Sequence, residues 1–496
     1  MAQPSSALRT VVTRRGVLLG IGGSAAALLA ACTTPSTPAA TQPVNTPVAK
    51  PAPASTAAAN TAPAVVQPAA AKPGTSIEGK QGLLWGLQYD PHIETYNKLA
   101  AAFEKKTGAK LTVQGGAGSS ADLAVKIPAA IAAGTGPDVA CLLGKRLLPL
   151  LQRKLLVDVT PIYAEAKVDP AKDFIGDSVE AYTYEGQIWG VPVEVNGVGN
   201  QVAVPVEDVD KLGLTASTPP MNGKDFFDSY QALWDLSKAL MVKDASGNVK
   251  RWGLSSQGWE TQSLMGLIRS QGVKWWDPDA KKFNIDSEAG ITAFSLLVES
   301  PVKMGIETQF DQNSPDAALA GKVAVTRGNG GAVSQGRALG YHYELAMAPP
   351  VGATSTGTDP LYVGEGGWGF IGFQAAKNKD VMMEFLRFML TTEAQGIFSS
   401  IYGGSISAMR AVNDDPTKFK DTERWETTSA LRYKKNADRT QYYGTGYGYI
   451  TEIEKHCMAT CADVRTSKLT SREAAAQLQK LVEQQYAQFL DDAKKL

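Results

Sequence analysis

Few side chains in this chain are of the types that carry out catalysis. The sequence contains three histidines, His92, His342 and His456, and none stands in a motif for a nucleophile or a zinc site. Cys457 and Cys461 would share one face of a helix, but no second ligand pair lies nearby and His456 would point away from Cys461. We therefore expect no catalytic residue, no metal and no cofactor. These two cysteines are expected to be buried thiols or to form a local disulfide.

Aromatic side chains beside polar ones offer a different chemistry, the binding of a small polar solute. A neutral sugar presents hydroxyl groups at its edges and apolar C–H patches on its faces, so its site combines aromatic rings with polar side chains. Trp85 ends an apolar stretch, and Tyr89 and Asp90 follow it closely. Two interpretations stay open. Either these residues contact a ligand, or Trp85 belongs to the core and Asp90 only caps the next helix.

These residues lie in an alternating pattern of strands and helices. Short apolar runs predict three strands, at 83–85, 111–113 and 139–143. The first strand should break at Gly86. Apolar residues at helical spacing predict one helix from Asp90 to just before Gly108 and another over 123–133. Strands and helices that alternate at this spacing favour an α/β fold, with a parallel sheet and helices on its faces.

Further elements are predicted toward the C-terminus. A hairpin is expected at 184–192 with its turn at Glu185–Gly186, and Thr470 with Glu473 forms a capping box that starts a last helix over 471–493. The other expected helices are 147–156, 226–240, 263–271, 287–298, 380–390 and one from about 393, and the other expected strands are 323–325, 345–347 and 369–373.

The first 78 residues contain signals for export. Residues 13–19 (TRRGVLL) form a twin-arginine start, and a short, glycine-rich apolar run ends at residues 29–32 (LAAC), which resemble a lipobox. Residues 1–32 are thus interpreted as a twin-arginine lipoprotein signal peptide, with Cys32 as the site of lipidation. Residues 33–78, rich in Ala, Pro and Thr, are expected to form a disordered tether. The protein is then extracytoplasmic and lipid-anchored to the cell membrane; the alternative is an ordinary cleaved signal with a chance cysteine.

Length and charge limit the remaining classes. About 420 residues follow the tether, which is too many for one compact core and suggests two or three lobes. The chain has 49 basic and 49 acidic residues, so no overall field favours nucleic acid. We expect no nucleic-acid partner and a monomer.

Four motifs follow one another in the order typical of a known family. They are residues 129–139 (AAIAAGTGPDV), 184–192 (YEGQIWGVP), 320–325 (AGKVAV) and 366–370 (GGWGF). Over nearly all of residues 80–496, the chain resembles the extracellular solute-binding proteins of ABC sugar importers, of the maltodextrin-binding type (family 1). The resemblance implies a two-lobed periplasmic-binding-protein fold, type II-like, with hinge crossings between α/β lobes. The N-terminal lobe would comprise 79–197 plus 372–412, and the C-terminal lobe 198–371 plus 413–496.

The resemblance also implies a function and a set of ligand-binding positions. The protein would capture a mono- or oligosaccharide in the cleft between its lobes and deliver it to the permease subunits of an ABC transporter. Lys145 and Arg146 follow the third strand, where the family places polar sugar-binding side chains. This basic pair indicates an anionic or phosphorylated ligand, or only the solvated start of a helix.

The other implied positions are spread along the chain, and for the aromatic ones the alternative is packing between the lobes. They are Asn196 at the first crossing, Trp259 and Glu260 in the second lobe, Asn329 after the strand at 323–325, Trp368 at the second crossing, and Tyr447 in a Gly-Tyr loop. Aromatic residues that relatives carry near Leu142 and Gly331 are missing here, which argues against a long glucan as ligand.

Three other functions compete with sugar import. The same fold could bind a sugar phosphate, a polyol, a polyamine or an oxyanion, or it could serve a sensor partner instead of a permease. A tethered extracellular hydrolase is the third alternative. It would need paired carboxylates such as Glu194 and Glu365, and nothing in the linear sequence indicates that these two meet.

Overall fold

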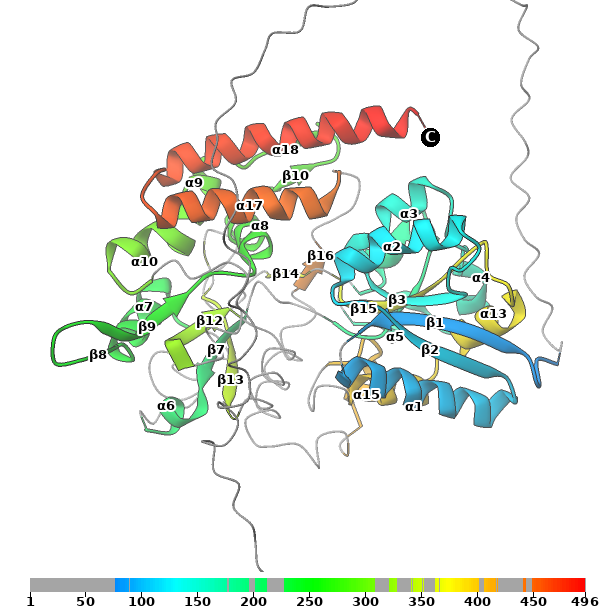
Figure 1. Cartoon of the computed structure of the whole chain (residues 1–496). Coiled ribbons are helices and arrows are strands. Elements are labelled where there is room, and N and C mark those ends of the chain that lie inside the picture. The colour runs from blue at the N-terminus through cyan, green and yellow to red at the C-terminus, as the bar shows by residue number, and fades with distance from the viewer. Residues whose placement is uncertain are drawn as a thin grey trace, which may run out of the picture. The chain divides into compact units, whose positions relative to one another are not determined.

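The first three strands pair in parallel, as the alternation of strands and helices predicts. In the computed structural model (Figure 1), β1 (Gln81–Leu87) lies between β2 (Lys110–Ala117) and β3 (Val139–Leu143). β15 (Trp368–Gly372) and β6 (Val191–Pro192) extend this sheet with antiparallel pairing, in the order β2-β1-β3-β15-β6. We call this sheet and its helices the first lobe.

The structure describes the following residues: 76–88, 90–175, 178–195, 201–211, 227–307, 321–327, 340, 342–349, 351, 362–364, 366–400, 406–415, 417, 440–442 and 448–495. The helices of the first lobe are α1 (Asp90–Thr107), α2 (Ser120–Ala132), α3 (Leu148–Gln152), α4 (Thr160–Glu165), α5 (Pro170–Asp173), α13 (Lys379–Phe388), α14 (Thr392–Ser399) and α15 (Arg410–Asn413), with the short 3₁₀ turns η1 (Gly144–Arg146) and η2 (Glu180–Tyr182). Its hairpin pairs β4 (Thr183–Tyr184) with β5 (Gln187–Ile188).

A second five-stranded sheet forms the core of what we call the second lobe. Its order is β13-β7-β12-β9-β8, and its strands are β7 (Gln201–Pro205), β8 (Val242–Lys243), β9 (Val249–Ser255), β12 (Val323–Arg327) and β13 (Tyr343–Met347). Its helices are α6 (Val206–Lys211), α7 (Tyr230–Ala239), α8 (Glu260–Ser270), α9 (Glu288–Phe294), α10 (Ser300–Lys303), α17 (Ile450–Arg465) and α18 (Ser471–Ala493), and a π-helical segment, η4 (Ser295–Glu299), joins α9 to α10. Two small ladders pair β10 (Trp276–Asp277) with β11 (Lys282–Phe283) and β14 (Tyr362–Gly364) with β16 (Thr440–Tyr442).

The C-terminal helices cover one side of the second lobe and reach the space beside α2 and α3 (Figure 1). α17 packs against α8 and α18, and it also contacts η1 of the first lobe. The capping box predicted for the last helix is confirmed: the Thr470 side chain accepts from the Glu473 N–H, and the Glu473 side chain accepts from the Thr470 N–H. None of the helices among the described residues combines the length and the apolar character that a membrane crossing requires.

Two predicted boundaries are wrong for local reasons. The strand expected to break at Gly86 continues to Leu87, with an irregularity in its pairing with β2 between these two residues. Gly86 leaves room for Tyr96 of α1, since a Cβ there would lie 2.2 Å from a ring carbon of Tyr96. The helix expected over 147–156 ends at Gln152, because Lys154 adopts a φ of 54° and Leu156 then bridges to Phe373.

Two other predictions agree closely with the structure. β3 spans the expected 139–143, and the hairpin turns at Glu185–Gly186, where both residues have positive φ, 51° and 79°. Trp368 pairs with Leu143 at the start of β15, so the chain is part of the first lobe's sheet from Trp368 onward.

Candidate functional site

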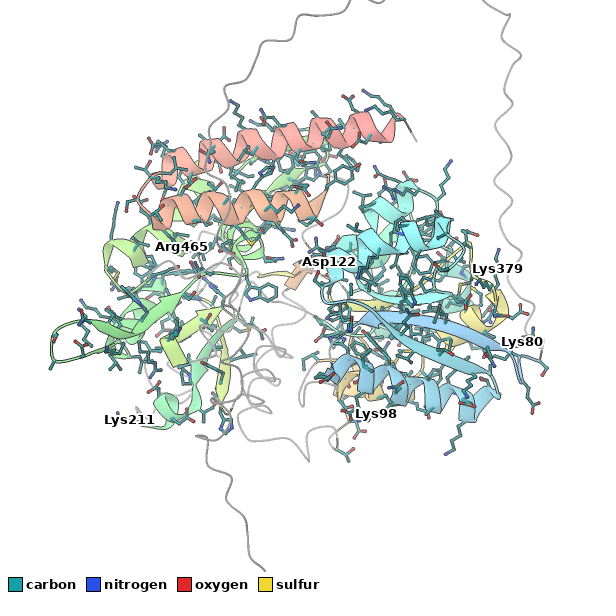
Figure 2. All side chains as sticks on the ribbon, in the orientation of Figure 1. Lys80, Lys98, Asp122, Lys211, Lys379 and Arg465 are labelled. Carbon is teal, nitrogen blue, oxygen red and sulfur yellow. The ribbon has the colours of Figure 1, made fainter. Side chains whose placement is uncertain are left out.

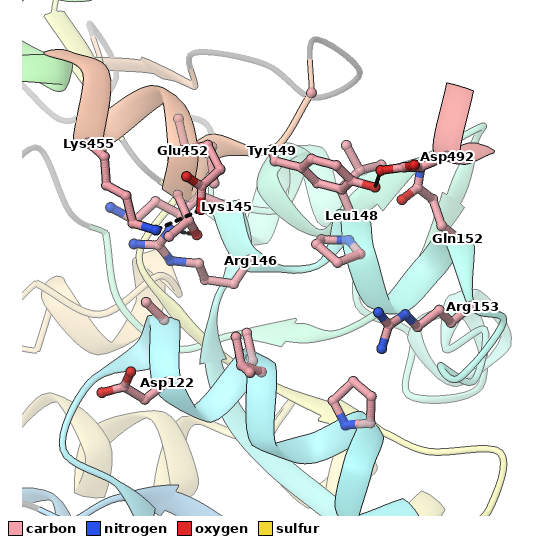
Figure 3. Close-up of a pocket in the computed structure, with 18 of the residues that line it drawn as sticks. Asp122, Lys145, Arg146, Leu148, Gln152, Arg153, Tyr449, Glu452, Lys455 and Asp492 are labelled. Carbon is pink, nitrogen blue, oxygen red and sulfur yellow. Dashed lines mark hydrogen bonds and ion pairs between the residues drawn. The ribbon is translucent and has the colours of Figure 1, made fainter. Parts of the chain in front are cut away.

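The end of β3 positions the basic pair. All five residues of β3 are buried and apolar, and the strand lies in the middle of its sheet between β1 and β15. The chain then turns through η1, which contains Lys145 and Arg146. Because η1 contacts α17, the two long side chains meet a helix of the second lobe rather than solvent (Figure 3).

A carboxylate of α17 joins the two cations. Lys145 Nζ lies 2.7 Å from Glu454 Oε1, and Arg146 Nη2 lies 2.7 Å from Glu454 Oε2. Arg146 Nη1 also donates to Thr451 Oγ1 at 2.6 Å, and Gln262 Nε2 of α8 donates to Glu454 Oε1 at 3.3 Å. Each lobe therefore contributes charged groups to one hydrogen-bonded bridge, which we call the interlobe bridge (Lys145, Arg146, Glu454).

The interlobe bridge is largely shielded from water. Lys145 and Arg146 are each 7% exposed, and the Glu454 side chain is 16% exposed. Burial alone would raise the pKa of Glu454, but Lys145 and then Arg146 outweigh it and hold that pKa below its ordinary value. Glu454 is thus a carboxylate at neutral pH. The bridge contains two positive groups and one negative group.

A cavity of about 690 Å³ lies beside the interlobe bridge (Figure 3). Its walls come from α2, from η1 and α3, from the start of α17 and from the end of α18. The lining residues are Ala121, Asp122, Ala124, Val125, Pro128, Lys145, Arg146, Leu148, Pro149, Gln152, Arg153, Gly448, Tyr449, Ile450, Thr451, Glu452, Lys455, Asp492 and Lys495. Across it, Tyr449 donates to Asp492 Oδ2 at 3.2 Å. Mostly apolar walls with a few polar groups suit a small organic molecule.

Trp85, Asp90 and Trp368 do not line this cavity. Trp85 is 9% exposed and donates through Nε1 to Gln114 on β2, while Asp90 is exposed at the start of α1. Trp368 is 8% exposed and packs edge-on against His92, with 5.1 Å between ring centroids. Burial lowers the pKa of His92 to about 4, so this ring is neutral in the physiological range.

Trp259 and Glu260 lie at the start of α8 in the second lobe. Trp259 is half-buried and precedes the helix. Glu260 is 3% exposed and pairs with Arg465 of α17, which also binds Glu307. α8 also contributes Gln262, the amide on the interlobe bridge, so Glu260 stabilises the helix that presents one of the donors to Glu454.

Several predicted residues lie outside the described residues: Tyr89, Asn196, Asn329, Tyr447 and the proposed lipidation site Cys32. Of the remaining predicted residues, the structure brings Lys145 and Arg146 together with the second lobe and with the cavity.

Glu454, Thr451 and Gln262 were not predicted from the sequence. Glu454 is 309 positions from Lys145, and no local pattern marks it as a partner. The only available signal was its place near the start of a helix that also contains Cys457 and Cys461. Those two cysteines are buried free thiols, which rules out a disulfide between them here, and no group of three or more potential metal ligands occurs among the described residues.

Comparisons with known proteins identify solute-binding proteins as similar to this chain. The family model for bacterial extracellular solute-binding proteins matches residues 89–396. Among solved structures, the maltose/maltodextrin-binding domain of Bdellovibrio bacteriovorus bound to maltotriose has a TM-score of 0.63 at 16% identity, covering 82% of this chain and 99% of that one. An ABC substrate-binding protein of Listeria monocytogenes with cycloalternan gives 0.65 at 15%, covering 82% and 98%.

A third structure, an ABC transporter solute-binding protein of Thermotoga lettingae bound with α-D-tagatose, gives a TM-score of 0.63 at 18% identity, covering 81% of this chain and 100% of that one. At these identities the likeness concerns the fold alone, a two-lobed α/β solute-binding fold. No curated protein sequence matches the chain.

Proposed function

Because the chain belongs to the bacterial extracellular solute-binding proteins, we propose that it captures a carbohydrate between its two lobes and delivers it to the permease of an ABC importer. One observation carries the proposal: side chains of both lobes meet in the interlobe bridge beside a cavity of about 690 Å³. A solute that contacts both lobes at once favours their closed arrangement, and a permease can distinguish that arrangement from the open one.

The class of solute is inferred from the walls of the cavity and from the structural neighbours. Tyr449 offers a ring and a hydroxyl group, and the interlobe bridge offers charged donors and acceptors. Such a mixture suits sugar rings with their apolar faces and polar edges. The neighbours with bound maltotriose, cycloalternan and tagatose support a mono- or oligosaccharide. Trp259, Trp368 and Tyr447 remain proposed sugar-stacking residues. Tyr89, Asn196 and Asn329 remain proposed ligand contacts.

A ligand panel tests this proposal. The melting temperature of the protein is measured with maltotriose, maltotetraose, tagatose, polyols, sugar phosphates and polyamines, and each positive compound is titrated by calorimetry. A ligand at 100 times its dissociation constant stabilises a protein by about 2.7 kcal/mol, so a true ligand gives a clear shift. Stabilisation by a polyamine or by a polyol, and by no sugar, would contradict the carbohydrate assignment.

A matched pair of variants ties binding to the interlobe bridge. Lys145→Met should weaken sugar binding at least tenfold because it removes a buried donor between the lobes. Lys80→Met removes a half-buried lysine that pairs with Asp380 in the first lobe, and it should leave binding unchanged (Figure 2). Equal affinities of the two variants would place the ligand elsewhere in the molecule.

Two further parts of the proposal concern location and chemistry. The LAAC motif supports lipid anchoring at Cys32, and the twin arginines support export of the folded protein. Cys32→Ser should then move the protein from the membrane fraction to the medium. Release of product from a glycoside library, with loss of the activity in a Glu→Gln variant, would instead favour the hydrolase alternative.

A further inference from the structure

We propose that Glu454 makes the site selective for uncharged solutes, because its carboxylate occupies the place between Lys145 and Arg146 that an acidic group of a solute would otherwise take. This inference rests on the proposed function, namely that the solute binds at the interlobe bridge. It names the charge class of the solute, which the basic pair in the sequence leaves open.

The geometry around Glu454 is that of an anion site. Each of its two oxygens accepts from a different cation at 2.7 Å, Oε1 from Lys145 Nζ and Oε2 from Arg146 Nη2. The amide of Gln262 adds a third donor at 3.3 Å. Two cations and a neutral donor around a carboxylate are the arrangement by which proteins hold a carboxylate or phosphate group of a ligand. Here the second lobe supplies that anion itself.

The charges around the interlobe bridge give Glu454 two effects on specificity. With Glu454 in place, an acidic solute would compete with an anion that is covalently part of the protein, and it would meet a like charge close by. Without Glu454, two cations that are each 7% exposed would lose a shared counter-charge. Removing a counter-charge from buried cations is costly, so the site would then favour an added anion. One side chain thus separates a site for neutral solutes from a site for anionic ones.

The test compares three forms of the full chain, the wild type, Glu454→Gln and Asp463→Asn. Asp463→Asn is a matched control, because it removes one negative charge from the same helix. Asp463 pairs with Lys468 at the surface and does not line the cavity. Inorganic phosphate is titrated at constant ionic strength by calorimetry, and melting temperatures are recorded in parallel.

Glu454→Gln should bind phosphate at least tenfold more tightly than the wild type and the Asp463→Asn control, and phosphate should raise its melting temperature. The double variant Lys145→Met/Glu454→Gln, which has one cation fewer at the site, should lose that gain. If Glu454→Gln binds phosphate no better than the wild type, the proposal is overturned.

If Glu454→Gln does not fold, the selectivity for uncharged solutes is tested on the wild type instead. Galactose and galacturonate, which differ by one carboxylate, are titrated into the wild type along with glucose and glucuronate. The proposal expects the neutral member of a pair to bind at least tenfold more tightly, and binding of the acidic member with equal or higher affinity overturns it. If no sugar binds, the proposed carbohydrate function fails, while the phosphate gain in the folded variants still judges Glu454 independently.

Discussion

Replacing Arg465 by methionine removes the cation from a buried cluster of charges in the second lobe. Arg465 Nε lies 2.9 Å from Glu307 Oε1, and Nη2 lies 3.0 Å from Glu260 Oε1 and 2.8 Å from Ser256 Oγ. The three charged side chains are 1%, 0% and 3% exposed for Arg465, Glu307 and Glu260, respectively. Figure 2 shows Arg465 on α17, on the side of the helix that faces the rest of the second lobe.

The expected loss of stability is large, because the substitution leaves two carboxylates buried without their cation. Breaking a buried ion pair by removing one partner costs about 3–5 kcal/mol. At roughly 2–4 °C per kcal/mol for a unit of this size, the melting temperature should fall by roughly 6 °C or more. The control is Arg472→Met, which breaks an ion pair with Glu288 that is 68% and 80% exposed and should cost less than about 1 kcal/mol.

The loss caused by Arg465→Met should also depend on pH. Burial raises the pKa of Glu307, although Arg465 opposes the shift, so the folded protein binds this proton more tightly than the unfolded chain does. Stability from this group therefore falls as pH rises from the ordinary glutamate value, about 4.3, through the raised one. Without Arg465 the pKa of Glu307 rises further, so the pH range over which stability falls extends to higher pH. The deficit should thus be smaller at pH 5 than at pH 8.

Urea or thermal unfolding followed by tryptophan fluorescence at these two pH values measures both effects. A deficit no larger than that of Arg472→Met would refute the reasoning about buried charge. A large deficit that is the same at pH 5 and pH 8 would refute the role assigned to Glu307.

Three further predictions concern single positions. Gly86→Ala should destabilise the protein by about 1–3 kcal/mol, because the new Cβ would lie 2.2 Å from a ring carbon of Tyr96. Gly118→Ala should leave the stability unchanged, because a Cβ there would have no atom within 4 Å. Chemical denaturation of the two variants measures the difference. Thr470→Ala should cost about 1 kcal/mol by removing the cap of α18, and unchanged helix unfolding by circular dichroism would contradict this. Burial raises the pKa of Cys457 to about 12, so iodoacetamide should label it, as shown by peptide mapping, only after denaturation.

The order of elements in the first lobe followed from the sequence because each element depends on local patterns. β3 is a continuous run of buried apolar residues, and the helices before it have apolar residues on one face. The capping box of Thr470 and Glu473 likewise specified the start of α18 within four residues of sequence. The helix expected over 147–156 ends early because Lys154 has a positive φ. Lysine is not a residue type that predicts a positive φ, so the sequence did not indicate this end.

The candidate site was likewise predictable only in part from the sequence. The sequence and its family resemblance pointed to Lys145 and Arg146, since they follow a strand that must end at the ligand-facing edge of a parallel sheet. Neither could decide between an anionic ligand and a solvated helix start. The structure shows a third arrangement, in which both side chains are buried against Glu454.

By itself, then, the sequence determined the class of the protein: its alternating α/β elements and the motifs of a solute-binding family are all local or ordered along the chain. Only the tertiary structure decided the charge at the site. Lys145 and Glu454 are separated by 309 positions, and the 2.7 Å contact between them exists because two lobes, each folded around its own sheet, bring η1 and α17 together. A pairing of that range leaves no pattern in the sequence, since nothing near either residue depends on the other until the chain has folded.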